Sequence, residues 1–446
     1  MGWTSPRRVL VVGLGSSGVA AARLAGTHGA EVTVTDRKPE PKLGPALAEL
    51  PAGTRRVLGG HPVSCLDEVD AVVVSPGVAA DEPLLEAARA RGLEVLTEIE
   101  FAWRHRPDDP LVAVTGSNGK STVTALVSEM LRASGLLAVA GGNLGPPASE
   151  LALNSLWKIW VLEVSSFQAE LLTAMRPTVG VFLNLSQDHL ERHPDMATYL
   201  EAKRRLFAFQ HAGDCLVLNA DDKASADTPS VARPRLFSLE TAADGWLDGS
   251  TLRLGESPLV DRDELLLAGR HNLANVLAAS LAALELGATL GAMRRTLRSF
   301  RGLSHRHRTI LVSNGVRWVD DSKATNVGAT LAALSGYPDR SVHLILGGQA
   351  KKQDFKPLVP ELGRAAASVY LIGVDAEPIS AAIGDAAPVV MSGTLREAVE
   401  QARAAAGPGD TVLLAPACAS FDQFANYSER GTRFAELAQE EVSRCP

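Results

Sequence analysis

The chain has 446 residues, which is too long for one hydrophobic core and predicts about three domains. Its composition is that of a globular protein, with 46% hydrophobic and 21% charged residues. The formal net charge of −7 provides no global positive field, so local groups must bind any anionic ligand. These properties exclude a protein that binds nucleic acid through bulk charge.

The cysteines and the apolar stretches indicate the compartment. Four scattered cysteines (Cys65, Cys215, Cys418 and Cys445) form no CxxC pair and no zinc-ligand spacing. A long chain with so few cysteines is typical of a reduced, intracellular protein. No apolar stretch reaches transmembrane length without interruption. We therefore expect a cytoplasmic protein that does not insert into a membrane.

The first segment carries a glycine-rich turn between a strand and a helix. Residues 8–12 form a short apolar strand, Gly13-Leu14-Gly15-Ser16-Ser17-Gly18 follows, and a second strand over 31–35 ends at Asp36. This GxGxxG pattern, with an acidic residue about 20 positions later, is the dinucleotide fingerprint. Taken alone it predicts an NAD-dependent oxidoreductase. The chemistry itself requires only a diphosphate at a helix N-terminus and a ribose near Asp36.

A third apolar strand, over 71–74, ends at Ser75-Pro76-Gly77. Ligands of open α/β sheets bind at such strand ends, although a simple turn is equally compatible with these residues. The proline-bracketed stretch 106–110 precedes a new strand, and Gly302-Leu303 marks a second break. We therefore divide the chain into domains of residues 1–106, 107–302 and 303–446.

The central segment is organised around Gly116-Ser117-Asn118-Gly119-Lys120-Ser121-Thr122. An apolar strand enters this turn and an amphipathic helix leaves it, so free backbone N–H groups and the positive helix end should meet there. Lys120 adds a positive charge, and Ser121 or Thr122 adds a hydroxyl that can bind Mg²⁺. The spacing departs from a standard Walker A loop at Val114, and a plain strand–turn–helix connection is the alternative. We predict a nucleoside triphosphate site.

Other residues with useful chemistry follow predicted strands. Glu163 ends a strand over 158–164, where it could bind Mg²⁺ or orient a water molecule. His189 and Lys203 are by default structural or solvated residues. Strands and helices alternate after residue 303, which predicts a parallel or mixed sheet. Three of its strand ends could converge on one substrate, and they are Asp320–Asn326, Gly347–Lys351 and Ala415–Asp422.

These motifs, in this order, resemble the Mur ligase family over essentially the whole chain. The ATP loop of the family is similar to Gly116–Thr122, and its central motifs are similar to Leu162–Gln168, Asn184–His189 and His271-Asn272 with Asn275. The branch that adds D-glutamate is resembled by Asp321–Asn326 and Ala417–Phe424. The nearest alternative is a sister ligase that adds a different amino acid.

The resemblance implies an α/β protein of three domains: an N-terminal Rossmann-like domain for a UDP-sugar, a central P-loop-type ATPase sheet, and a C-terminal Rossmann-like domain for the amino acid. It implies a monomeric, ATP-dependent amide ligase of peptidoglycan precursor synthesis. This enzyme would join D-glutamate to UDP-MurNAc-L-Ala through an acyl phosphate. Because the implied sites are split between two domains, we expect the C-terminal domain to close over the central one.

The resemblance also implies roles for single residues, grouped here by ligand. The UDP-sugar would be held by Gly15, Ser16, Ser17, Asp36, Lys38, Ser75, Pro76, Gly77 and Asn143. ATP would be held by Gly116, Ser117, Asn118, Gly119, Lys120, Ser121, Thr122, Asn272, Asn275, Arg306 and Asp321. Two Mg²⁺ ions would be held by Ser121, Glu163, His189 and Lys203, with Lys203 carbamylated. D-glutamate would be framed by Thr325, Lys351, Ser420, Phe421 and Tyr427. The catalytic set would be Lys120, Asn143, His189, Lys203 and Lys323.

Two other classes of protein stay open for comparison. An NAD-dependent oxidoreductase would explain the first glycine turn but would not explain the Lys120 loop. A non-enzymatic nucleotide-binding regulator would bind ATP without D-glutamate-stimulated release of ADP.

Overall fold

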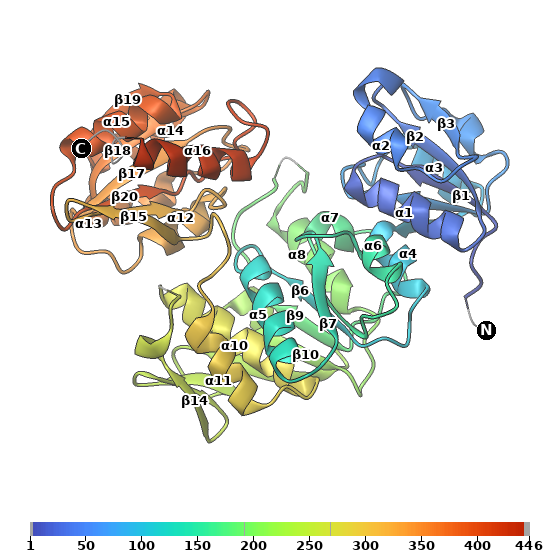
Figure 1. Cartoon of the computed structure of the whole chain (residues 1–446), viewed down its shortest axis with the longest axis horizontal. Helices are drawn as coiled ribbons and strands as arrows, with labels where there is room; N and C mark the ends of the chain where they lie inside the picture. Colours follow the sequence, from blue (N-terminus) through green and yellow to red (C-terminus); the bar gives the residue numbers. More distant parts are fainter. Residues whose placement is uncertain (1–2, 191, 268, 441–446) are drawn as a thin grey trace.

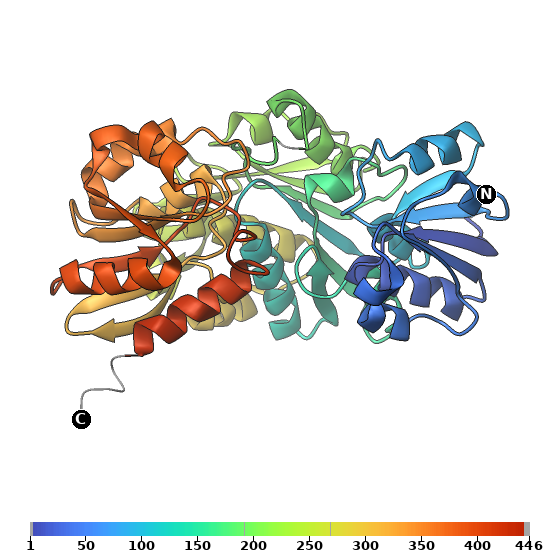
Figure 2. The same cartoon turned by 90° about the horizontal axis from the view of Figure 1, so that it is seen from above.

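The computed structural model describes residues 3–190, 192–267 and 269–440. Three β-sheets follow one another along the chain, and Figure 1 shows each of them in its own body, covered by helices. Seen from above, the three bodies form a row with the second in the middle (Figure 2). This arrangement confirms the predicted three-domain α/β fold.

The first sheet is an all-parallel sheet with the strand order β3-β2-β1-β4-β5. Its strands are β1 (Arg8–Val12), β2 (Glu31–Asp36), β3 (Arg55–Leu58), β4 (Ala71–Val74) and β5 (Glu94–Thr97). Helices α1 (Ser16–Thr27), α3 (Pro83–Ala90) and α4 (Glu98–Arg104) connect and cover them. The strand order reverses between β1 and β4, so the glycine turn and Ser75-Pro76-Gly77 meet at the switch point where such sheets bind ligands.

The second sheet has nine strands in the order β14-β13-β12-β11-β10-β9-β6-β8-β7. They are β6 (Leu111–Thr115), β7 (Ala138–Gly142), β8 (Ile159–Glu163), β9 (Val179–Phe182), β10 (Cys215–Asn219), β11 (Arg233–Ser238), β12 (Gly245–Asp248), β13 (Thr251–Leu254) and β14 (Ser257–Asp261). The strands from β7 to β12 pair in parallel, and the last two turn antiparallel. Helices α5 (Lys120–Ala133) and α10 (Arg270–Glu285) share one apolar cluster against this sheet.

The third sheet is mixed, because its edge strand β15 runs antiparallel to five parallel strands. Its strands are β15 (Arg308–Ser313), β16 (Val316–Asp320), β17 (Val342–Gly347), β18 (Ala366–Ile372), β19 (Val389–Gly393) and β20 (Thr411–Leu414). Helices α12 (Val327–Leu334), α15 (Leu395–Ala405) and α16 (Tyr427–Gln439) pack on it. The domain boundaries drawn from the sequence fall between the three sheets and stay predictions at the level of single residues.

The first two bodies share one hydrophobic core. A continuous apolar cluster runs from Leu24 of α1 and Phe101 of α4 to Leu151 of α6 (Ala148–Ala152) and Trp160 of β8. The N-terminal sheet is therefore fixed on the central one by packing. Among the described residues, no helix combines the length and the apolarity that crossing a bilayer requires. Cys65, Cys215 and Cys418 are buried free thiols, and Cys445 lies outside the described residues.

Gly180 gives a direct test of packing in the central sheet. It lies in β9, and a Cβ atom there would come within 2.6 Å of Phe207 Cδ1 and 2.9 Å of Leu216 Cδ1. We expect Gly180→Ala to lower the free energy of unfolding by about 1–3 kcal/mol because the Phe207 ring and the Leu216 methyl group must shift. Urea unfolding would measure the change. Gly213→Ala is the control, since its Cβ would meet nothing within 4 Å; equal stabilities of the two variants would contradict the expectation.

Candidate active site

The turn between β6 and α5 forms a compact loop around the Lys120 ammonium group. The Nζ atom of Lys120 donates hydrogen bonds to the carbonyl oxygens of Gly116 and Ser117, each at 2.8 Å. Burial lowers the pKa of Lys120. Gly119 has a φ of +85°, and a Cβ there would lie 2.3 Å from Asn275 Oδ1. Only glycine fits this position, so the loop can lie directly against α10.

Glu163 places a carboxylate beside this loop. It ends β8, the neighbour of β6, and its side chain is buried. One oxygen accepts a hydrogen bond from Asn143 Nδ2 at 2.6 Å, and the other accepts one from the Ser121 hydroxyl. Burial acts to raise the pKa of Glu163, but the charges of Lys120 and Arg306 outweigh it and hold that pKa below its ordinary value. The carboxylate is therefore ionised among cations.

Lys203 is a buried lysine on α8 (Met196–Arg204), with only 1% of its surface exposed. Its Nζ atom donates to the Gly116 carbonyl oxygen at 2.8 Å and lies 4.4 Å from the centre of the Tyr199 ring. Burial, followed by the nearby charge of Lys120, holds the pKa of Lys203 well below its usual value. This environment disfavours the charged form of the amine, in a basic helical run that by default lies on a solvated face.

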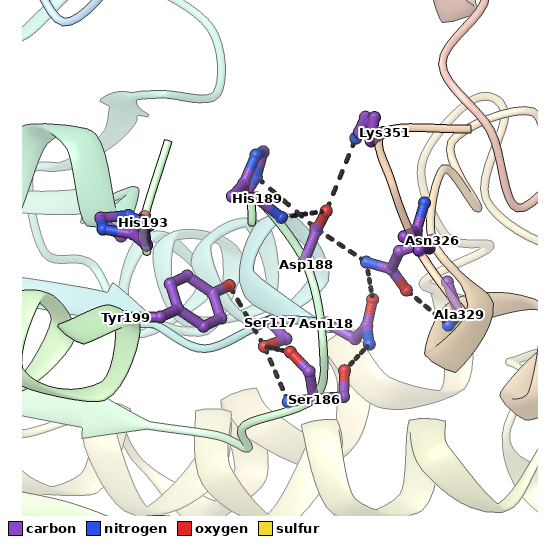
Figure 3. A network of polar contacts seen from close by, with 12 residues as sticks. Ser117, Asn118, Ser186, Asp188, His189, His193, Tyr199, Asn326, Ala329 and Lys351 are labelled. Carbon is purple, nitrogen blue, oxygen red and sulfur yellow. Dashed lines mark hydrogen bonds and ion pairs between the residues drawn. The ribbon is translucent and has the colours of Figure 1, made fainter. Parts of the chain in front are cut away.

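The segment after β9 wraps around the same loop (Figure 3). Asn184 Oδ1 accepts a hydrogen bond from the Asn118 backbone N–H at 2.9 Å. Asp188 accepts one from the His189 backbone N–H at 3.0 Å, and its carboxylate lies 3.6 Å from Lys351 Nζ. The rings of His189 and Phe167 are 4.8 Å apart between centres. Asp188 is therefore a bridge from the central domain to Lys351 of the C-terminal one.

The C-terminal domain sends two more cations toward the loop. The guanidinium of Arg306 donates a hydrogen bond to the Ser121 hydroxyl. Lys323 Nζ lies 3.9 Å from the centre of the Tyr427 ring. Burial, with Arg306 as the next cause, lowers the pKa of Lys323 to about 8. Two domains thus supply positive charge to one point.

A cavity of about 520 Å³ collects these side chains. The following residues, predicted from the sequence to belong to the site, line this cavity: Pro76, Gly77, Ser117, Asn118, Gly119, Lys120, Asn143, Glu163, His189, Lys203, Arg306, Lys323, Thr325, Lys351, Ser420, Phe421 and Tyr427. A second cavity of about 330 Å³ adjoins it and is lined by the predicted residues Asn118, Gly119, Thr122, Asn272, Asn275, Arg306, Asp321 and Lys323. The two cavities share Asn118, Gly119, Arg306 and Lys323. A ligand with a flat group in the smaller cavity can therefore extend charged groups into the larger one.

The structure leaves one predicted group apart from both cavities. Gly15, Ser16, Ser17, Asp36 and Lys38 lie at the start of α1 and the end of β2, and they line neither cavity. Asp36 accepts hydrogen bonds from the backbone N–H groups of Leu14 and Lys38, each at 2.7 Å, so it holds the glycine turn in place. Ser75 joins the same turn by donating to the Gly13 carbonyl oxygen at 2.8 Å. Pro76 and Gly77 connect this region to the larger cavity.

Sequence reasoning missed several residues of the site. Tyr199 is buried, and its hydroxyl oxygen lies 3.2 Å from Ser117 Oγ. In the sequence, nothing distinguishes it from an ordinary helix residue. Asn326 bridges two domains; the sequence placed it in the segment Asp320–Asn326 but gave it no role of its own beyond a helix N-cap. Asn219, Asp221 and Arg270 line the smaller cavity after β10 and before α10. No local pattern singles these three residues out.

Comparisons with known proteins agree with this architecture. The family models called Mur ligase MurD-like N-terminal domain, Mur ligase middle domain, and Mur ligase glutamate ligase domain match residues 7–97, 114–283 and 305–418. The chain belongs to the Mur ligase family.

Similar curated proteins carry a more specific name. A UDP-N-acetylmuramoylalanine–D-glutamate ligase of Anaeromyxobacter dehalogenans is 44% identical over 98% of each chain. One of Myxococcus xanthus is 41% identical over 98% of each chain. Among solved structures, MurF of Thermotoga maritima in complex with ADP covers 98% of both chains with a TM-score of 0.64 and 17% identity. The UDP-N-acetylmuramate–alanine ligase MurC of Thermotoga maritima has a TM-score of 0.60 at 17% identity, over 98% of this chain and 100% of its own. The two structures share the fold.

The pKa of Lys323 makes nucleotide binding dependent on pH. Below about pH 8 its side chain is a cation, and above that value it becomes neutral and attracts phosphate less. We expect affinity for MgATP, measured by titration calorimetry, to weaken above about pH 8. In Lys323→Arg the charge persists, so the weakening should begin at a higher pH. Identical pH profiles for the two proteins would contradict this assignment.

Proposed function

We propose that this protein is an ATP-dependent ligase that joins the carboxyl group of UDP-MurNAc-L-Ala to the amino group of D-glutamate, a step of peptidoglycan precursor synthesis. The observation that carries the proposal is that Lys120, Glu163 and Lys323, from two domains, line one cavity. The names of the curated relatives support the choice of both substrates. The function also implies a cytoplasmic protein, where ATP is available, and the family resemblance favours a monomer.

Each domain would hold one substrate. The UDP-sugar would lie across the switch point of residues 1–106, with its diphosphate at the N-terminus of α1 and its sugar end passing Pro76-Gly77 toward Asn143. ATP would place its adenosine in the smaller cavity, between Asn272 and Asn275 of residues 107–302 and Asp321 of the next domain. Its phosphates would lie at the Lys120 loop. D-glutamate would enter from residues 303–446, framed by Thr325, Lys351, Ser420, Phe421 and Tyr427.

The chemistry explains why a triphosphate is needed. A carboxylate does not acylate an amine near neutral pH because oxide is a poor leaving group. Its oxygen attacks the γ-phosphorus of ATP, the bond to ADP breaks, and an acyl phosphate forms. The neutral amine of D-glutamate then attacks the acyl carbon, inorganic phosphate leaves with the bonding pair, and the amine loses a proton. Holding the reactants in register supplies about 7–11 kcal/mol of such a barrier.

The side chains of the cavity would stabilise the charge that this reaction develops. Lys120 and Arg306 face the phosphate loop from two domains, and Lys323 lies beside them. His189 and Asn143 lie on the same cavity wall, where the substrate carboxylate must be oriented. Docking of the C-terminal domain would exclude water, which hydrolyses acyl phosphates.

The donor set fits Mg²⁺. This ion takes one or two carboxylates and completes its shell with phosphate oxygens and water, as the single Glu163 carboxylate next to Ser121 and the phosphate loop allows. A second ion would be held by His189 and Lys203 if the Lys203 amine has added carbon dioxide to become a carbamate. That addition requires a neutral amine, and the burial of Lys203 favours this form. Bound Mg²⁺ would neutralise phosphate charge.

One assay separates the proposal from its alternatives. UDP-MurNAc-L-Ala and MgATP are supplied with a panel of single amino acids, and phosphate release is measured. We expect release that depends on D-glutamate. Release with another amino acid would identify a sister ligase, and ATP binding without release would identify a regulator. Consumption of NADH in place of ATP would support an oxidoreductase.

Lys203 has its own test. We expect Lys203→Arg to lose turnover, because a guanidinium cannot form the carbamate, while MgATP still binds. The measurement is steady-state phosphate release together with calorimetric nucleotide titration. In the unchanged protein, ¹³C-bicarbonate should give a carbamate signal by NMR that the variant lacks. Unchanged turnover would assign Lys203 a purely structural role.

A further inference from the structure

Asn326 accepts one hydrogen bond and donates two in a buried place between two domains. It is the N-cap of α12, where its Oδ1 atom accepts a hydrogen bond from the Ala329 backbone N–H at 2.7 Å. This fixes the orientation of the amide, so Nδ2 points away from the helix. Nδ2 donates to Asp188 Oδ2 at 2.9 Å and to Asn118 Oδ1 at 3.3 Å. Figure 3 shows these bonds leaving one side chain toward the central domain.

The two acceptors belong to different parts of the candidate site. Asn118 lies in the phosphate loop, and its own Nδ2 donates to Ser186 Oγ at 3.2 Å, which leaves its Oδ1 facing Asn326. Asp188 lies in the segment that carries His189. A single C-terminal side chain therefore joins the phosphate loop to the segment next to the reacting carboxylate.

A close backbone approach supports the same contact. At Gly328, the second residue of α12, a Cβ atom would lie 2.8 Å from Ser186 Oγ and 3.2 Å from Ser186 Cβ. The φ of this glycine is not in the left-handed region, so only the neighbour across the domain gap excludes a side chain there. Gly328 thus lets the start of α12 seat directly on the central domain.

We propose that Asn326 is a positioning residue that latches the C-terminal domain to the phosphate loop. The latch fixes the segment 321–326, which presents Lys323 and Thr325 to the cavity. It couples the occupied phosphate loop to the amino-acid side of the site. The inference deepens the proposed function and rests on it for the identity of the substrates.

The geometry at Asp188 shows how the latch and the amino acid can coexist. Asp188 accepts the Asn326 bond at 2.9 Å, whereas its distance to Lys351 Nζ is 3.6 Å. The bond to Asn326 is the shorter contact and uses a different carboxylate oxygen. Lys351 can therefore leave Asp188 for a substrate carboxylate while Asn326 keeps the domains docked.

The sharpest test is Asn326→Asp. Aspartate is as good an N-cap as asparagine, so α12 keeps its cap, but the two donated hydrogens are lost and a carboxylate faces Asp188. The control is Asn314→Asp, the same change at an exposed turn between β15 and β16 of the same domain. Circular dichroism and thermal unfolding would show that both variants fold.

Two readouts separate a latch from a structural residue. In small-angle X-ray scattering with MgATP, we expect Asn326→Asp to be more extended than the wild type and than Asn314→Asp. We expect kcat/KM for D-glutamate to fall on the order of 10- to 100-fold, while the affinity for UDP-MurNAc-L-Ala stays unchanged because that site lies in the first domain. Wild-type compaction and kcat/KM in Asn326→Asp would overturn the proposal.

Gly328→Ala tests the same interface without touching a polar group. Alanine favours a helix, so α12 itself should be no less stable, yet its Cβ would collide with Ser186. Gly363→Ala in α13 (Val359–Ala365) is the control, because its Cβ would lie an ordinary 3.6 Å from the Ala386 carbonyl oxygen. We expect only Gly328→Ala to lose compaction; equal compaction in both would also overturn the latch.

These results distinguish the latch from the proposed function. The scattering comparison is made with MgATP and without D-glutamate, so it does not depend on the ligase reaction. A wild type that compacts but releases no phosphate with D-glutamate would refute the function alone. The latch would still be judged by comparing the two Asn→Asp variants.

Discussion

The structure depends on a concentration of buried basic side chains around two carboxylates. Lys120, Lys203 and Lys323 line the same cavity as Arg306, with Glu163 among them. Burial lowers the pKa of each of the three lysines, and neighbouring cations lower it further. The two carboxylates of the cavity, Glu163 and Asp188, are outnumbered by its basic side chains, which also include Lys351. The cavity is therefore built for a polyanion, and a triphosphate completes its charge balance.

The same crowding of basic groups affects the pKa of Lys120 and that of Lys203 to different degrees. Lys120 is surrounded by backbone carbonyl oxygens and lies close to Glu163, which favours its charged form. Lys203 shares only the Gly116 carbonyl oxygen with it and lies under the Tyr199 ring. The nearby Lys120 charge then acts against a charge on Lys203. The surroundings thus favour the charged form more at Lys120 than at Lys203.

The sequence predicted the parts of the fold that rest on local, buried patterns. β1 and β4 were predicted with the bounds that the structure shows, because both are short runs of buried aliphatic residues. The strand predicted over 158–164 is slightly shorter in the structure, where β8 covers Ile159–Glu163. β3 and β11 were not predicted, because each begins with exposed arginines and β11 contains Pro234. Their strand character comes from neighbouring strands.

The residues of the candidate site likewise divide into those that the sequence could predict and those that it could not. The phosphate loop was predictable because strand, glycine turn, lysine and helix are contiguous, and family resemblance supplied residues such as Arg306 and Lys351. The bridge through Asn326 was not predictable, because it depends on how two separately folded domains meet. The sequence places Asn326 at the end of a candidate motif and as a helix cap, and Gly328 as a weak helix residue, but neither signal indicates a contact with another domain.

The charge distribution gives the domain contact a direction. Arg306, Lys323 and Lys351 arrive from the C-terminal domain at a central domain that already holds Lys120 and Lys203. Without an anionic ligand, docking brings like charges together, and Glu163 and Asp188 oppose that repulsion. A bound triphosphate turns the repulsion into attraction to a shared ligand. The hydrogen bonds of Asn326, whose amide carries no net charge, then select the register because they need close geometry.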